Sequence, residues 1–89
     1  MYRHEVEERL SRIFIKRSSI NFLREPEKRS LKLLSRSGIP ARELLHVYFD
    51  VKKAFNVLIP EDDVAGGRFD TFDNIVELIY EQLHGHGSA

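Results

Sequence analysis

The sequence PARELLHVYFDVKKAF, residues 40–55, has the apolar spacing of a helix that contacts neighbours on several sides. Apolar side chains recur at intervals of four, three and four along one face, which is a helical periodicity. This stripe consists of Leu44, Tyr48, Val51 and Phe55. A second group widens it: Leu45, Val47, Phe49 and Ala54. So broad an apolar surface predicts a central helix, beginning at Pro40 because proline suits the first helical position.

Two further helices are predicted, one on each side of this segment. The first runs from about residue 2 to 16, and its apolar face is Val6, Leu10, Ile13 and Phe14. The last begins after a cap at Asp70 or Thr71. Its apolar face is Phe72, Ile75, Val76, Ile79 and Leu83. If the three helices pack on one another, we expect the core to include Leu44, Val51, Phe55, Ile75 and Ile79.

The connections between these helices are less regular. Residues 18–39 lack a clear period, and their scattered apolar side chains predict a long loop that is pinned to the core. Pro26 can begin a short helix within it. Pro60 can begin another, whose first turn carries the acidic residues 61–63 and which ends at Gly66-Gly67. The sequence therefore predicts an all-α bundle of three main helices plus one short helix, with a long first loop.

Composition limits the class of protein further. With 89 residues, 42% of them hydrophobic, we expect one domain over residues 1–83 and a flexible tail over residues 84–89. The absence of cysteine, of a membrane span and of a secretion signal predicts a cytoplasmic protein. We expect a monomer, because the apolar stripes of the three helices can bury one another. Residues 1–42 carry a net charge of +6 and residues 43–89 one of −6. We expect these halves to fold together and neutralise in part, rather than to bind nucleic acid.

Residues 38–83 resemble the acyl and peptidyl carrier protein superfamily. The resemblance rests on Gly38-Ile39-Pro40 before the central helix, on the exit FNVLIP at residues 55–60, and on Thr71-Phe72 at the start of the last helix. The short acidic helix between them is a further shared feature. Over residues 1–37 only the order of elements is similar, and Gly66-Gly67 lengthens the last connection. The resemblance implies a small acyl-carrier-like bundle.

The attachment site of this family is altered in the chain. In carrier proteins the central helix begins with Asp-Ser-Leu, and the serine carries phosphopantetheine. Here Pro40, Ala41 and Arg42 occupy these positions, and a methyl side chain cannot carry a phosphodiester. The chain looks closest to the acyl carrier-related proteins of bacterial peptide-maturation systems. This resemblance implies a non-enzymatic interaction module without a cofactor, whose partners are biosynthetic proteins or a precursor peptide.

Two alternative functions remain open at this stage. Ser37, four residues before Ala41, is either a displaced phosphopantetheine site of a genuine carrier or a turn serine that bonds the backbone. The chain could also be a small structural or regulatory helical domain. No Ser-His-Asp, zinc-ligand or phosphate-loop pattern is present, so we do not expect an enzyme. His84 and His86 are assigned to the tail rather than to a metal site.

The candidate partner-binding surface is the narrow polar stripe of the central helix, made of Arg42, His46, Asp50 and Lys53. Because its charges are mixed in sign, a partner adapted to an acidic carrier should bind it poorly. The alternative is a solvated face without a partner, on which His46 and Asp50 form an i,i+4 pair.

Overall fold

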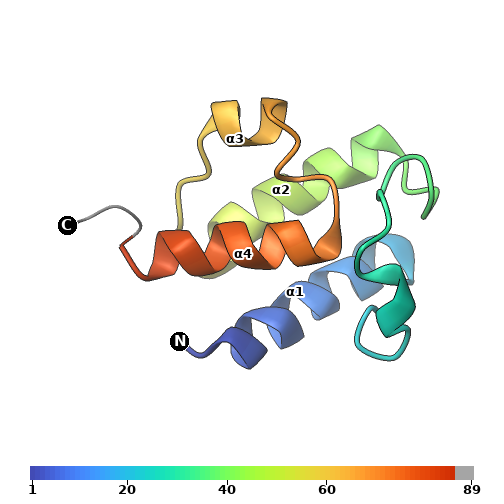
Figure 1. Cartoon of the computed structure of the whole chain (residues 1–89), viewed down its shortest axis with the longest axis horizontal. Coiled ribbons are helices and arrows are strands. Elements are labelled where there is room, and N and C mark those ends of the chain that lie inside the picture. Colours follow the sequence, from blue (N-terminus) through green and yellow to red (C-terminus); the bar gives the residue numbers. More distant parts are fainter. Residues whose placement is uncertain (86–89) are drawn as a thin grey trace.

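Residues 1–85, the part of the chain that this computed structural model describes, contain four α-helices and one short 3-10 helix joined by loops (Figure 1). In chain order they are α1 (Arg3–Ser18), η1 (Pro26–Lys28), α2 (Ala41–Phe55), α3 (Glu61–Ala65) and α4 (Phe72–Leu83). No strand occurs among the described residues. The prediction of a small all-α bundle with three main helices and a short one is confirmed, and η1 is the short helix expected at Pro26.

The helix ends follow local chemistry. The N-terminus of α4 is capped by Thr71, whose Oγ1 accepts a hydrogen bond from the Asn74 amide at 3.0 Å. Helix α1 ends two residues later than predicted, at Ser18, where the next residue turns into the left-handed region with φ 63°. Pro40 is the cap of α2 and not its first helical residue, because its ψ of 146° is extended. Ala41 therefore opens the helix.

The core lies where α1 packs against both α2 and α4. Three rings meet at its centre: Phe14, Phe22 and Phe72, with centroids 4.8 to 6.0 Å apart. Val51, Phe55, Ile75 and Ile79 are buried as predicted. The prediction for Leu44 was wrong, because this side chain is only partly buried and packs against the edge of the core.

The long first connection is pinned to the core, as predicted. Phe22, Leu33 and Ile39 are its buried residues. Backbone hydrogen bonds also tie it to the start of α4. The Leu33 amide donates to the Asp70 carbonyl at 2.8 Å, and the Asp73 amide donates to the Arg29 carbonyl at 3.1 Å. The connection is therefore a structural layer that closes one end of the bundle (Figure 1).

The basic first half and the acidic second half neutralise each other in part. Four ion pairs join residues 1–42 to residues 43–85: Arg3–Glu77, Arg17–Asp50, Arg29–Asp73 and Lys32–Asp70. The expected charge pairing between the halves is confirmed.

His84 lies against the end of α4. His84, assigned to the flexible tail, donates its backbone N–H to the Tyr80 carbonyl at 3.1 Å, and its ring lies 4.1 Å from that of Tyr80. Residues 86–89, including His86, lie outside the described residues. Among residues 1–85, no helix combines the length and the apolar character needed to cross a membrane.

Candidate functional site

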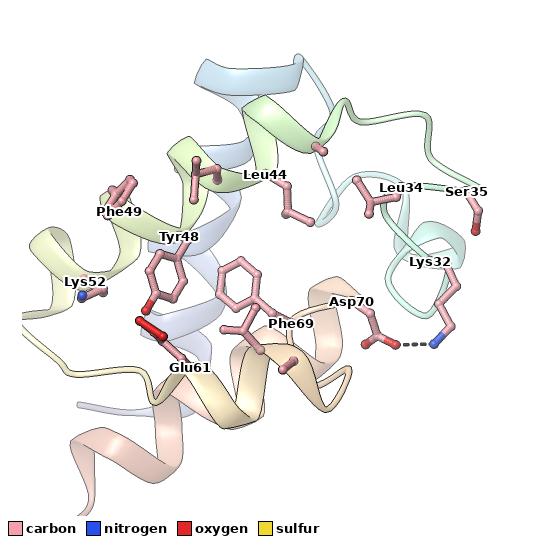
Figure 2. Close-up of a pocket in the computed structure, with 14 residues that line it drawn as sticks. Lys32, Leu34, Ser35, Leu44, Tyr48, Phe49, Lys52, Glu61, Phe69 and Asp70 are labelled. Carbon is pink, nitrogen blue, oxygen red and sulfur yellow. Dashed lines mark hydrogen bonds and ion pairs between the residues drawn. The ribbon is translucent and has the colours of Figure 1, made fainter.

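A groove of about 860 Å³ lies between α2, α3 and the segment at residues 32–35 (Figure 2). We call it the α2–α3 groove. Its α2 wall is Ala41, Leu44, Leu45, Tyr48, Phe49 and Lys52. The other walls are Lys32, Leu34, Ser35, Glu61, Val64, Ala65, Phe69 and Asp70. Its volume lies within the roughly 300–1,000 Å³ of ligand pockets, and most of its lining is apolar.

Two aromatic rings form the floor of this groove. Tyr48 and Phe69 meet edge to face with their centroids 5.6 Å apart (Figure 2). The Tyr48 hydroxyl donates a hydrogen bond to the Ile59 carbonyl at 3.0 Å, which fixes the ring and anchors the segment before α3. Phe69 is buried. The floor is thus continuous with the core, since Phe69 belongs to the core cluster and Tyr48 packs against it.

The α2 wall presents large apolar side chains to solvent. Leu45 is 52% exposed and Phe49 is 56% exposed, and Leu34 on the opposite side is 52% exposed. The prediction that α2 touches neighbours on several sides was wrong for this face, because α3 is too short to cover it. Neighbouring apolar side chains exposed along a groove are typical of a binding surface.

Three cations of α2 lie in or next to its apolar wall in the sequence of the helix. The Lys52 ammonium group lies 5.1 Å from the centre of the Tyr48 ring. Arg42 and Lys53 are exposed. Within residues 1–85, none of these three side chains forms an ion pair with a carboxylate. Lys32, across the groove, is engaged with Asp70 (Figure 2).

The four residues of the predicted polar stripe do not form one surface. Arg42 and Lys53 are exposed beside the groove, but Asp50 is partly buried at the contact with α1. Its carboxylate accepts two hydrogen bonds from Arg17, which lowers the pKa of Asp50. The expected pair between His46 and Asp50 does not form among the described residues: Asp50 binds Arg17, and the Nδ1 atom of His46 lies 3.7 Å from Glu43, too far for a hydrogen bond.

The two positions considered for phosphopantetheine attachment, Ala41 and Ser37, differ in their exposure to solvent. Ala41 is exposed at the first turn of α2 and lines the groove. The Ser37 hydroxyl is buried and has no hydrogen-bond partner among the described residues, so it satisfies no backbone group as a turn serine would. A transferase that modifies a serine must reach its oxygen, and in this conformation the Ser37 oxygen is covered.

Sequence reasoning missed the groove itself. Leu45 and Phe49 were assigned to packing, and Lys52 was given no role. One signal was present, since the apolar residues of α2 cover more of its circumference than its neighbours can bury. No three His, Asp or Glu side chains among residues 1–85 cluster as metal ligands. The arrangement is suited to binding an apolar surface.

Comparisons with protein-family models, curated proteins and solved structures give no match to this chain.

Proposed function

We propose that the protein is a non-enzymatic interaction module of the cytoplasm, related to acyl carrier proteins, which acts in a peptide-maturation or similar biosynthetic system. It docks biosynthetic proteins or a precursor peptide through α2 and the adjoining segment. The observation that carries the docking role is the α2–α3 groove, in which half-exposed Leu45 and Phe49 stand beside the floor of Tyr48 and Phe69.

The relation to carrier proteins rests on the sequence motifs of residues 38–83. The order of elements is also the one that the resemblance implies: a long first loop, a central helix, a short acidic helix and a last helix. Ala41 stands at the first turn of α2, where the family has its serine. The module therefore works without covalent cargo. The biosynthetic setting rests on the resemblance alone.

The polar groups of the groove support binding rather than catalysis. The Tyr48 hydroxyl is held by the Ile59 carbonyl, and Lys32 is paired with Asp70. Neither pair places a nucleophile next to a free base, which covalent catalysis requires. The apolar wall, in contrast, exposes large side chains to water. A partner that covers them removes apolar surface from water, which favours binding.

Affinity capture from extracts of the native host tests the docking role. The bait proteins are the wild type, Leu45→Glu in the groove, and Leu58→Glu as a matched control, since Leu58 is 78% exposed but does not line the groove. We expect at least one protein to be retained by the wild type and the control and lost with Leu45→Glu. Identical retained proteins for all three baits would show that the groove is no docking site.

A further inference from the structure

We infer that the α2–α3 groove receives an amphipathic helix whose carboxylates lie along one edge, the edge that faces α2. The inference rests on the proposed docking function and names the chemistry of the partner.

One ridge of α2 has an apolar middle and a cation at each end. This α2 ridge consists of Arg42, Leu45, Phe49 and Lys53. Their intervals of three, four and four place successive residues next to one another on the helix surface. Leu45 and Phe49 supply the apolar contact, and the two flanking charges are exposed on either side of it.

The charge of this ridge is positive because Asp50 is engaged elsewhere. Asp50 follows Phe49 in the sequence, but its carboxylate faces α1 and holds Arg17 at 2.7 Å. Arg42, Lys52 and Lys53 have no carboxylate partner within residues 1–85. A partner with carboxylates at these positions gains charge complementarity, and a basic partner is repelled.

The length of the ridge favours a helix over an acyl chain. Arg42 and Lys53 are eleven residues apart, which is about 16 Å along the helix axis at 1.5 Å per residue. Three turns of a partner helix cover this distance and can present carboxylates at both ends. A fatty acid has a single carboxylate at one end.

The opposite wall fixes which edge of the partner is acidic. Glu61 lines the groove on the α3 side, and Asp62 beside it is exposed. Asp63 is paired with Arg68 and contributes less. Carboxylates of a partner would be repelled along this wall. An occupant with acidic residues on its α2 edge and neutral or basic residues on its α3 edge matches both walls.

The experiment is a peptide-display selection on the immobilised full chain, with a library of randomised 18-residue peptides that carries no bias toward helix or charge. Binders that also bind Leu45→Gln, which disrupts the apolar wall without adding a charge, are removed. We expect the enriched peptides to carry apolar residues at helical spacing and an excess of Asp and Glu on one edge. The strongest peptide is then synthesised, labelled and titrated by fluorescence anisotropy, and its helicity on binding is followed by circular dichroism.

Three variants test which side chains of α2 the selected peptide contacts. Reversal of both ridge cations, Arg42→Glu with Lys53→Glu, should weaken the strongest peptide about tenfold at low salt, and less as salt rises. Leu58→Glu should bind it like the wild type. Leu45→Ala repeats the groove test with a smaller change, and far-UV circular dichroism checks that each variant keeps its helices.

The outcomes separate this inference from the docking function itself. Selection of basic or extended peptides that require Leu45 would overturn the acidic helix and leave docking in place. Failure to select any peptide that requires Leu45 would overturn the inference, while the capture experiment decides the docking function on its own. Binding of dodecanoate that requires Leu45, together with no selected peptide, would identify a lipid chain as the occupant and overturn the inference as well.

Discussion

Arg17 of α1 and Asp50 of α2 form a two-point ion pair across the contact between these helices. The Arg17 Nε atom donates to one carboxylate oxygen of Asp50 at 2.7 Å, and a terminal guanidinium nitrogen donates to the other at 3.1 Å. Such paired hydrogen bonds are stronger and more directional than a single contact between charges. The pair fixes the rotation of α2 against α1, and it removes the acidic residue from the exposed stripe next to Phe49.

This pair makes stability depend on pH. The hydrogen bond from Arg17 lowers the pKa of Asp50 below its usual value of about 3.9, so the carboxylate is favoured in the folded state. The stabilisation of the fold by the Asp50 carboxylate is fully present above the pKa that Asp50 has in the unfolded chain. It is lost as the pH falls through the lower pKa of Asp50 in the folded protein. Asp50→Asn should therefore reduce the free energy of unfolding at pH 7 and flatten its decline between about pH 5 and pH 2.

Urea unfolding followed by circular dichroism at pH 7, 5 and 3 measures this effect. Asp62→Asn is the control, because Asp62 is exposed and forms no ion pair among the described residues. Some pH dependence will remain from Asp70, because its pKa is also lowered. Burial raises the pKa of Asp70, but the hydrogen bonds that it accepts from Lys32 and Asn74 lower it by more. Parallel pH profiles for wild type and Asp50→Asn would contradict the prediction.

The long first connection should contribute as much to the core as a helix does. Phe22→Ala removes a fully buried ring that stacks on Phe72 with centroids 4.8 Å apart. A loss of about 3–5 kcal/mol in the free energy of unfolding is expected for a buried phenylalanine. The neighbouring Leu23 is 40% exposed, so Leu23→Ala should cost less than about 1 kcal/mol. Equal effects of the two changes would show that the connection is only loosely attached.

Most of the fold could be predicted because helical periodicity is local. The intervals between Leu44, Tyr48, Val51 and Phe55 place α2 within one residue of its observed bounds. The arrangement of residues 19–40 could not be predicted. Hydrogen bonds such as Leu33 N–H to the Asp70 carbonyl join backbone groups that have no side-chain signature in the sequence. The partial burial of Leu44 also depends on where α3 lies, which periodicity in α2 does not determine.

The cap of α4 gives a prediction with a conservative control. Thr71→Ala removes the oxygen that accepts the Asn74 amide and should lower the free energy of unfolding by about 1 kcal/mol, within a range of 0.5–2. Thr71→Ser keeps this oxygen and should recover most of the loss. Denaturant unfolding of the three proteins compares them directly. If serine and alanine are equally destabilising, the methyl group of this nearly buried threonine matters more than its hydroxyl.

The protein should remain without phosphopantetheine. Incubated with coenzyme A and a broad-specificity phosphopantetheinyl transferase, the wild type should gain no mass in intact-protein mass spectrometry, because Ala41 has no hydroxyl and that of Ser37 is buried. A gain of one phosphopantetheine that disappears in Ser37→Ala would establish the displaced-site carrier instead. A natural carrier protein treated in parallel shows that the enzyme is active.

The candidate site could be predicted only in part, because its charge and its exposure depend on how the helices pack. Arg42 and Lys53 could be placed on one exposed face from their spacing, and both are exposed. Asp50 binds Arg17, which lies 33 residues away in the sequence. The sequence therefore predicts a stripe of mixed charge, and only the packing of α1 on α2 shows that Asp50 is not part of the exposed surface. The exposure of Leu45 and Phe49 depends in turn on the shortness of α3.

The exposed ridge should control association with a partner rather than stability. Reversal of Arg42 and Lys53 to glutamate should leave the free energy of unfolding within about 0.5 kcal/mol per substitution, because both side chains are exposed and unpaired within residues 1–85. Charges at the rim of an interface act mainly on the association rate, so capture of the partner should fall and the difference should shrink with added salt. The reversal of Arg9 and Arg12 on the exposed side of α1, outside the groove, is the matched control for a general change in net charge. Equal capture by both double variants, at low and at high salt, would mean that the α2 ridge is only a solvated face.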